Sequence, residues 1–337
     1  MIYTRHNAGA TYFKTCHASA NQYHLFATLK YNRPTPINPA AALLLNLRLP
    51  SPLQKLNLLP DMDLWIKRDD LIHPVVSGNK WRKLAGFIAQ LPPQATVLTF
   101  GGAHSNHLAA AATCLQVYGH KGIFVVRGQE LGPDSSSVLQ HCHKAGMQMQ
   151  FIERATFRQL RENHWQPATA EILDWQLPTD IHILPEGGSG PHNRTGCQQL
   201  WQEIKTQNLP DHIWLAAGTG GTARGLLHAM PSGSKIQMTV VSAVKGAHKE
   251  AAKTVAVARQ KGILLHWLDE TTFGGFAKTN AQLNQARQDF YQATDIPLDP
   301  VYNAKVWWHL SYFQPLPTEK VLWLHTGGFR PDITSNQ

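Results

Sequence analysis

The chain contains 337 residues, of which 43% are hydrophobic, and its formal net charge at pH 7 is +9. This length and composition can bury one large core or two smaller ones and lack the signatures of a disordered or collagen-like chain. The sequence contains no run of about 18 uninterrupted apolar residues, so no membrane span is predicted. The lysines and arginines are dispersed and form no long block, which argues against nucleic-acid binding, whereas an electropositive surface suits a phosphorylated cofactor and a carboxylate substrate.

The N-terminal segment, residues 1–45, contains no Asp or Glu, and we expect it to form a flexible extension. An acid-poor leader is also typical of organelle transit peptides, but this one lacks a clear amphipathic helix, so organelle targeting is the less favoured interpretation. Four cysteines without a paired spacing predict reduced thiols and a cytoplasmic protein. These are Cys16, Cys114, Cys142 and Cys197.

From residue 63 onward, short β-rich runs alternate with longer segments of helical periodicity. The predicted strands are residues 64–67, 96–100, 122–126, 148–152, 181–184, 213–217, 235–241 and 321–324. The predicted helices begin at or near Asn79, His104, Ser135, Thr195, Thr222 and Ala247. This alternation predicts an α/β fold with parallel sheets wrapped by helices, in two domains, with a ligand at the carboxyl ends of the strands between them.

The segment Ser77-Gly78-Asn79-Lys80-Trp81-Arg82-Lys83 places one lysine between small residues and a basic cluster. The amine of such a lysine can hold a carbonyl cofactor covalently. Taken alone, Lys80 is more simply explained as a solvated lysine at the start of a helix, since lysines are usually exposed. It becomes a candidate catalytic residue because further motifs accompany it.

The loop Gly218-Thr219-Gly220-Gly221-Thr222 joins an apolar strand to a helix. Its backbone amides and the helix N-terminus can converge on an anion, and the two threonine hydroxyls add donors. An ordinary tight turn would have the same composition. The loop lacks the terminal Lys-Ser/Thr of a P-loop, which argues against nucleotide hydrolysis.

A second glycine-rich turn, Gly101-Gly102-Ala103-His104-Ser105-Asn106, ends in two good helix-capping residues. The simplest interpretation of Ser105 and Asn106 is therefore an ordinary N-cap. His104 and His107 lie three residues apart, but two histidines without a further ligand make a poor zinc site, so no metal is expected.

These motifs, together with Asp299-Pro300-Val301-Tyr302 and His325-Thr326-Gly327-Gly328, resemble those of pyridoxal-phosphate enzymes of the tryptophan synthase β type, also called fold type II. The branch they resemble contains 1-aminocyclopropane-1-carboxylate deaminase and D-cysteine desulfhydrase. The likeness extends from about residue 46 to about residue 330. It implies pyridoxal 5'-phosphate as cofactor, a small amino acid as substrate and a homodimer as the assembly.

The resemblance also implies how the chain is divided. Residues 46–83 and 176–330 would form a larger cofactor-binding domain. Residues 84–175 would form a smaller α/β domain inserted into it, with the return near residues 177–180. Each domain would contain an open, largely parallel sheet flanked by helices, and the site would lie between the domains.

Five cofactor contacts follow from the resemblance. Lys80 would hold the aldehyde, Gly218–Thr222 and Lys83 the phosphate, Asn106 the phenolic oxygen, and Thr326 the pyridine nitrogen. On the substrate side, Ser105 would contact the substrate and relay a proton, and Tyr302 would lie close to both cofactor and substrate. The full expected substrate set is Ser105, Asn106, His107, Glu186, Phe276 and Tyr302. From the residues alone, Glu186 is as well explained by a solvated loop.

Two positions depart from the family pattern. Asn303 stands where ring-opening deaminases carry a Glu, and Phe276 stands where relatives carry another active-site tyrosine. We therefore expect a D-cysteine desulfhydrase-like β-elimination most, with Lys80, Ser105 and Tyr302 as catalytic residues. Two alternatives stay open: a 1-aminocyclopropane-1-carboxylate deaminase, and a cofactor-binding regulatory protein without activity.

Overall fold

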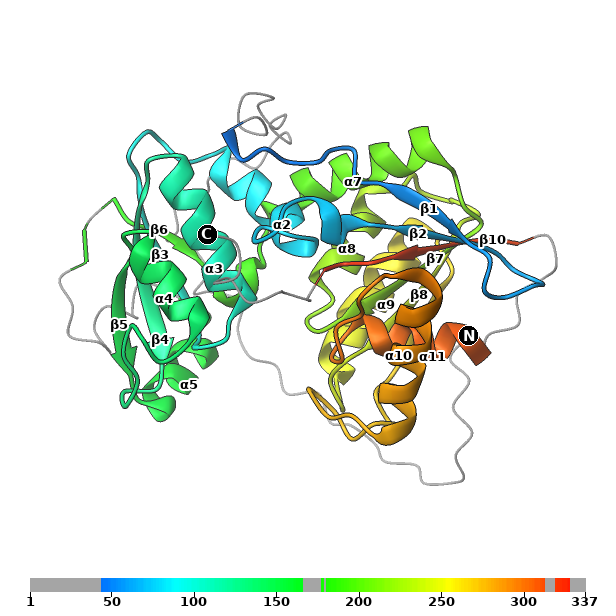
Figure 1. The fold of residues 1–337 in the computed structure, drawn as a ribbon. Helices are drawn as coiled ribbons and strands as arrows, with labels where there is room; N and C mark the ends of the chain where they lie inside the picture. Colours follow the sequence, from blue (N-terminus) through cyan, green and yellow to red (C-terminus); the bar gives the residue numbers. More distant parts are fainter. Residues whose placement is uncertain (1–43, 166–176, 179, 313–318, 328–337) are drawn as a thin grey trace, which may run out of the picture.

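The computed structural model describes residues 44–165, 177, 178, 180–312 and 319–327. Two α/β lobes lie side by side, each built around its own sheet (Figure 1). Among the described residues, no helix is both long enough and apolar enough to cross a membrane. The predicted α/β class with largely parallel sheets flanked by helices is confirmed.

The larger lobe contains a six-stranded sheet with the order β1-β2-β10-β7-β8-β9. All neighbours in it are parallel except β1, which runs antiparallel to β2. In this order the strands span Leu53–Leu56, Asp63–Lys67, Lys320–Leu324, His212–Ala217, Gln237–Ser242 and Leu265–Leu268. The central strands β10, β7 and β8 are buried over nearly their whole length because helices cover both faces of the sheet.

The smaller lobe contains a parallel four-stranded sheet with the order β5-β4-β3-β6. In this order the strands span Gln148–Ile152, Lys121–Arg127, Thr96–Gly102 and His182–Leu184. We expected the chain to return to the larger domain near residue 176, but β6 pairs with β3. The smaller sheet therefore continues to residue 184, because β6 buries Leu184 in the core of this lobe.

Helices cover both faces of each sheet (Figure 1). On the larger sheet, α7 (Asn193–Gln207), α8 (Gly221–Ala229) and α9 (His248–Lys261) share one core, and α10 (Ala281–Thr294) and α11 (Asn303–Tyr312) share the other. On the smaller sheet, α3 (Asn106–Val117) and α4 (Ser137–Lys144) pack on one face and α5 (Arg154–Glu162) on the other. The sequence did not predict α5, α10, α11, β1 or β9.

Helix α2 (Asn79–Ile88) connects the two lobes. It packs on α7 of the larger lobe, while its apolar residues Trp81 and Leu84 belong to the core of the smaller lobe. Two glycines permit the close approach of α2 and α7. A Cβ on Gly86 would lie 2.1 Å from a backbone oxygen of α7's N-terminal turn, and a Cβ on Gly196 would lie 2.0 Å from the Arg82 oxygen. The expected division at residue 83 therefore falls inside a helix that both lobes share.

A buried network of charges holds α2 in place. The Arg82 guanidinium donates to Asp69 at 2.8 and 3.0 Å and to Glu203 at 2.7 and 2.8 Å. Lys67 also donates to Glu203, at 2.7 Å. Burial opposes the charge on Arg82, but the two carboxylates outweigh it and raise its pKa. The two cations balance the two anions, so the network is stable only while it is complete.

We expect Arg82→Ala to lower the free energy of unfolding by about 3–5 kcal/mol, because it leaves buried Asp69 and Glu203 without their counter-charge. Urea unfolding followed by circular dichroism measures this loss. Arg154→Ala is the matched control, since Arg154 pairs with Glu130 in solvent and such pairs contribute little. Equal stability of the two variants would contradict a structural role for the network.

Candidate cofactor site

The N-terminus of α2 is fixed against the turn that follows β10. Gly78 has a left-handed backbone, with φ of 58°, and a Cβ there would lie 2.0 Å from the Thr326 carbonyl oxygen. The same carbonyl oxygen accepts a hydrogen bond from the backbone N–H of Asn79 at 3.0 Å. Only glycine satisfies both constraints at position 78. This contact fixes the start of α2, and with it the position of Lys80 in the first turn of the helix.

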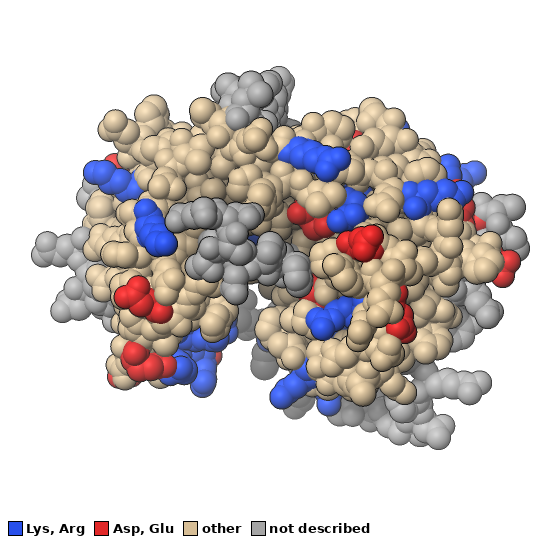
Figure 2. Space-filling view, viewed as in Figure 1, with Lys and Arg blue, Asp and Glu red and all other residues tan. Residues whose placement is uncertain are grey.

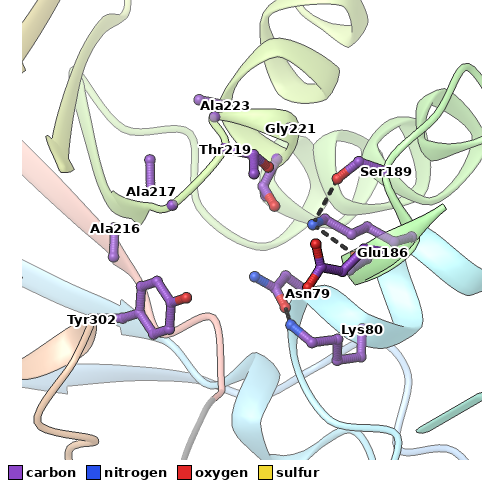
Figure 3. Close-up of a pocket in the computed structure, with 15 residues that line it drawn as sticks. Asn79, Lys80, Glu186, Ser189, Ala216, Ala217, Thr219, Gly221, Ala223 and Tyr302 are labelled. Atoms are coloured by element: carbon purple, nitrogen blue, oxygen red, sulfur yellow. Dashed lines mark hydrogen bonds between the residues drawn. The ribbon is translucent and has the colours of Figure 1, made fainter. Parts of the chain in front are cut away.

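The first turn of α2 forms one wall of a cavity of about 140 Å³. Lys80 and Tyr302 reach into it from facing sides, and Lys80 Nζ donates to Asn79 Oδ1 at 2.8 Å (Figure 3). The cavity is lined by Asn79, Lys80, Lys83, Glu186, Gly187, Ser189, Ala216, Ala217, Gly218, Thr219, Gly220, Gly221, Thr222, Ala223 and Tyr302. The lysine motif and the Gly218–Thr222 loop, far apart in sequence, therefore face each other.

One end of the cavity is suited to an anion. Gly218–Thr222 leads into the N-terminus of α8, and Gly220 takes the left-handed conformation that turns the chain there. A Cβ on Gly221 would lie 3.3 Å from Ser189 Oγ and 3.5 Å from Asn193 Nδ2. Amide N–H groups, hydroxyls and a side-chain amide thus surround one small space, as in other helix N-terminal anion sites. The sequence did not identify Asn193.

Lys83 adds a cation to the same end. Its Nζ donates to the Gly187 carbonyl oxygen at 3.1 Å and to Ser189 Oγ at 3.2 Å. Burial, with a further contribution from nearby Arg224, lowers the pKa of Lys83 to about 8. A bound anion would favour the protonated amine.

Tyr302 is positioned by the start of α11. The Asp299 carboxylate accepts hydrogen bonds from the backbone N–H groups of Val301, Tyr302 and Asn303 at 2.6–3.1 Å, which caps the helix. The Tyr302 hydroxyl lies close to Gly218, where a Cβ would be 3.5 Å away. Burial and the Asp299 charge raise the pKa of Tyr302 to about 12. The phenol is therefore protonated at neutral pH.

Thr326 follows β10, and its carbonyl oxygen accepts a hydrogen bond from Asn79 at the start of α2. Hydrogen bonds also hold the residues before and after it, His325 and Gly327. His325 Nε2 donates to the Pro297 carbonyl oxygen at 3.1 Å, and its Nδ1 lies 3.3 Å from Asp70 Oδ1. Asn303 Nδ2 donates to Asp299 Oδ2 and to the Gly327 carbonyl oxygen, both at 2.7 Å. Asn303 thus ties α11 to this turn, and neither Asn303 nor Thr326 lines the cavity.

The predicted substrate turn belongs to the smaller lobe. Ser105 is the N-cap of α3, because its Oγ accepts from the Leu108 N–H at 3.3 Å, and Asn106 is the first residue of that helix. Ser105, Asn106 and His107 do not line the cavity formed by the larger lobe and α2. The N-cap interpretation of Ser105 is correct. Its expected contact with the substrate stays a prediction.

His107 is buried and electrically neutral. Thr99 Oγ1 donates to the Leu184 carbonyl oxygen at 2.8 Å, so the 2.7 Å contact between this hydroxyl and His107 requires His107 Nε2 to donate. Burial, together with nearby Lys80 and Lys83, lowers the pKa of His107 well below its usual value. Within the described ranges, no group of three potential ligands could hold a metal ion.

The last two expected substrate residues lie at the rim. Glu186, on the short helix η2 (Glu186–Gly188), accepts from Arg161 Nε and from an Arg161 terminal nitrogen, both at 2.9 Å. Its carboxylate is therefore already paired with a guanidinium, in an ion pair that solvent reaches. Phe276 is 54% exposed, and its ring meets the edge of the Tyr302 ring at a centroid distance of 6.1 Å.

A lysine, a facing phenol and an anion-binding helix N-terminus, set in a parallel α/β fold, define the class of enzymes that use pyridoxal phosphate. Residues 44–302 match the family model described as pyridoxal-phosphate dependent enzyme, and the chain belongs to this family. The residues present fit the cofactor: the loop Gly218–Thr222 and Lys83 surround a space for its phosphate, and Lys80 offers an amine for its aldehyde.

Two named relatives share most of the chain. The bifunctional D-cysteine desulfhydrase/1-aminocyclopropane-1-carboxylate deaminase of Arabidopsis thaliana is 27% identical, over 83% of this chain and 76% of that protein. The D-cysteine desulfhydrase of Salmonella schwarzengrund is 26% identical, over 83% of this chain and 92% of that protein. The solved structure of a 1-aminocyclopropane-1-carboxylate deaminase homologue, 24% identical, covers 87% of this chain and 95% of its own with a TM-score of 0.66. It supports the fold.

We expect the cofactor-free protein to bind sulfate about tenfold more weakly at pH 9 than at pH 7. Lys83 is largely protonated below its pKa of about 8 and loses its charge above it, whereas sulfate keeps its charge throughout. Isothermal titration calorimetry at both pH values measures the change. Lys83→Gln should bind sulfate weakly at both. Wild-type affinity that stays constant between pH 7 and pH 9 would show that Lys83 is not the cation at this site.

Proposed function

We propose that this pyridoxal-phosphate enzyme removes a β-substituent and the amino group from a small amino acid, as a D-cysteine desulfhydrase does. With D-cysteine and water, the products would be sulfide, ammonia and pyruvate. The observation that carries the proposal is the convergence of Lys80, Lys83 and the Gly218–Thr222 loop on one cavity beside a protonated Tyr302. The two relatives with D-cysteine desulfhydrase in their names support the same reaction class.

In this proposal, Gly218–Thr222, Lys83 and Ser189 bind the phosphate, and Lys80 forms the covalent link to the cofactor. The bound cofactor supplies an electron sink for the substrate's α-carbon. Lys80 Nζ, once released from its link, takes the α-proton, and Asn79 Oδ1 orients the amine through the 2.8 Å hydrogen bond. The expected contacts of Asn106 with the phenolic oxygen and of Thr326 with the pyridine nitrogen stay predictions, because neither residue lines the cavity.

Tyr302 donates to the leaving group. A phenol with a pKa of about 12 is a hydrogen-bond donor at neutral pH and not a base, so it can stabilise the negative charge on a departing thiolate through a hydrogen bond while keeping its own proton. Ser105 would contact the substrate from the smaller lobe. Glu186 does not bind the substrate ammonium in this proposal, because Arg161 already occupies both of its oxygens.

The deaminase alternative is less favoured by this geometry. Ring opening would require a group at position 303 that faces the reaction, whereas the Asn303 amide points to Asp299 and to Gly327. A regulatory protein without activity is also disfavoured, because the amines and the anion site are all in place. That the enzyme is a cytoplasmic homodimer stays a prediction.

Lys80→Ala should abolish covalent attachment of the cofactor. Borohydride reduction followed by peptide mass spectrometry should find pyridoxal phosphate on the Lys80 peptide of the wild type and on no peptide of the variant. Lys83→Ala is the matched control on the same helix, since it keeps the amine at position 80 and should still be labelled at saturating cofactor. Labelling of another lysine in the wild type would contradict the assignment of Lys80 as the residue that binds the cofactor covalently.

We expect the holoenzyme to release pyruvate and sulfide from D-cysteine and no 2-oxobutanoate from 1-aminocyclopropane-1-carboxylate. Product analysis by chromatography with both substrates, and with L-cysteine and β-chloroalanine, distinguishes the candidates. Formation of 2-oxobutanoate would favour the deaminase. A holoenzyme that turns over none of these amino acids would favour the regulatory protein.

A further inference from the structure

Arg127 lies beside the turn that leads to Ser105 and Asn106. It is the last residue of β4 and is paired in register with Gly102 at the end of β3, so the two residues share one face of the smaller sheet. Gly102 has no side chain, and a Cβ there would lie 3.5 Å from a terminal nitrogen of Arg127. The guanidinium therefore covers the backbone of the turn at the carboxyl edge of the sheet.

Two arginines contact the ring of buried Phe157. The guanidinium carbons of Arg127 and Arg161 lie 5.8 and 5.5 Å from the ring centroid. Stacking on an aromatic ring restrains a guanidinium while leaving its N–H groups free to bind an anion. Phe157 thus holds two arginines at the rim of the smaller lobe.

The charges at this rim do not cancel. Arg161 is neutralised by Glu186, which lines the cavity. Arg127 is solvent-exposed, and its side chain forms neither an ion pair nor a hydrogen bond with any residue in the described parts of the chain; its guanidinium contacts Phe157 and lies against Gly102. Arg127 therefore leaves one uncompensated positive charge at the rim of the smaller lobe, on the same ring as Arg161.

The rim of the larger lobe also carries a positive charge. Lys245, just after β8, is exposed, and its Cβ lies 3.4 Å from where a Cβ on Gly275 would be, next to Phe276. Figure 2 shows Lys and Arg side chains on both lobes beside the hollow that separates them. A cavity mouth of this kind attracts anions.

The geometry points to a substrate whose β-substituent ends in an anionic group, bound by Arg127. This inference rests on the proposed elimination and narrows its substrate class. The α-carboxylate and the reacting carbons would stay at Lys80, and the far end of the leaving group would reach the smaller-lobe rim. The α-proton would go to Lys80 Nζ, the Cβ–X bond would break with its electron pair on X, and Tyr302 would donate a hydrogen bond to the departing anion. Water would convert the remainder to pyruvate and ammonia.

The matched probes are S-carboxymethylcysteine and its amide, S-carbamoylmethylcysteine, which have nearly the same size and differ in one charge. Both would be tested as D- and L-isomers with the wild-type holoenzyme. We expect kcat/KM to favour the carboxylate by about tenfold or more, since a charge-assisted bidentate hydrogen bond is much stronger than its neutral counterpart. If neither compound is turned over, calorimetric dissociation constants provide the same ratio.

The ratio should fall to about one in Arg127→Gln and be intermediate in Arg127→Lys, which keeps the charge without the planar fork. Arg154→Gln, at the exposed Arg154–Glu130 pair, is the control and should keep the wild-type ratio. Thermal unfolding would confirm that the variants are folded. A wild-type ratio near one, or a ratio that survives Arg127→Gln, would overturn the inference. Loss of turnover with D-cysteine and with both probes, while the binding ratio persists, would count against the proposed elimination only.

Discussion

The buried network around Arg82 is the constraint on which the site depends. Arg82 joins Asp69, which follows β2, to Glu203 on α7, so one side chain aligns these two parts of the larger lobe with α2. Lys80 and Lys83 lie on either side of Arg82 within one helical turn, and they point toward the cavity because Arg82 points away from it. An incomplete network would leave a buried charge, so α2 has little freedom to rotate its two amines out of place.

Most of the strand and helix alternation could be predicted because parallel strands that are buried on both faces form apolar runs, as 213–217 does. The limits are equally physical. Helix α10 was missed because only Leu283 and Phe290 of its residues are buried, which leaves a weak amphipathic signal. The sheet to which β6 belongs depends on its pairing with β3, and a three-residue strand contains no information about its partner.

The motifs located the two lysines and the anion loop, but not the groups that complete or neutralise them. Ser189 joins the anion space only because η2 folds against Lys83. Glu186 meets Arg161, 25 residues earlier in the chain, on a helix that the sequence did not predict. Position in a motif thus predicts which backbone lines a site, whereas the partner of a charged side chain follows from tertiary packing.

Phosphate binding at the Gly218–Thr222 loop is coupled to the protonation of Lys83. A buried amine such as Lys83 loses part of its proton because burial penalises the charged form and Arg224 adds repulsion. An anion at the Gly218–Thr222 loop reverses this balance, so phosphate binding and proton uptake favour each other. Among the described residues that line the cavity, Glu186 is the only carboxylate, and its pairing with Arg161 keeps it from competing with that anion. The ion pair at the rim therefore keeps the anion site available to the cofactor.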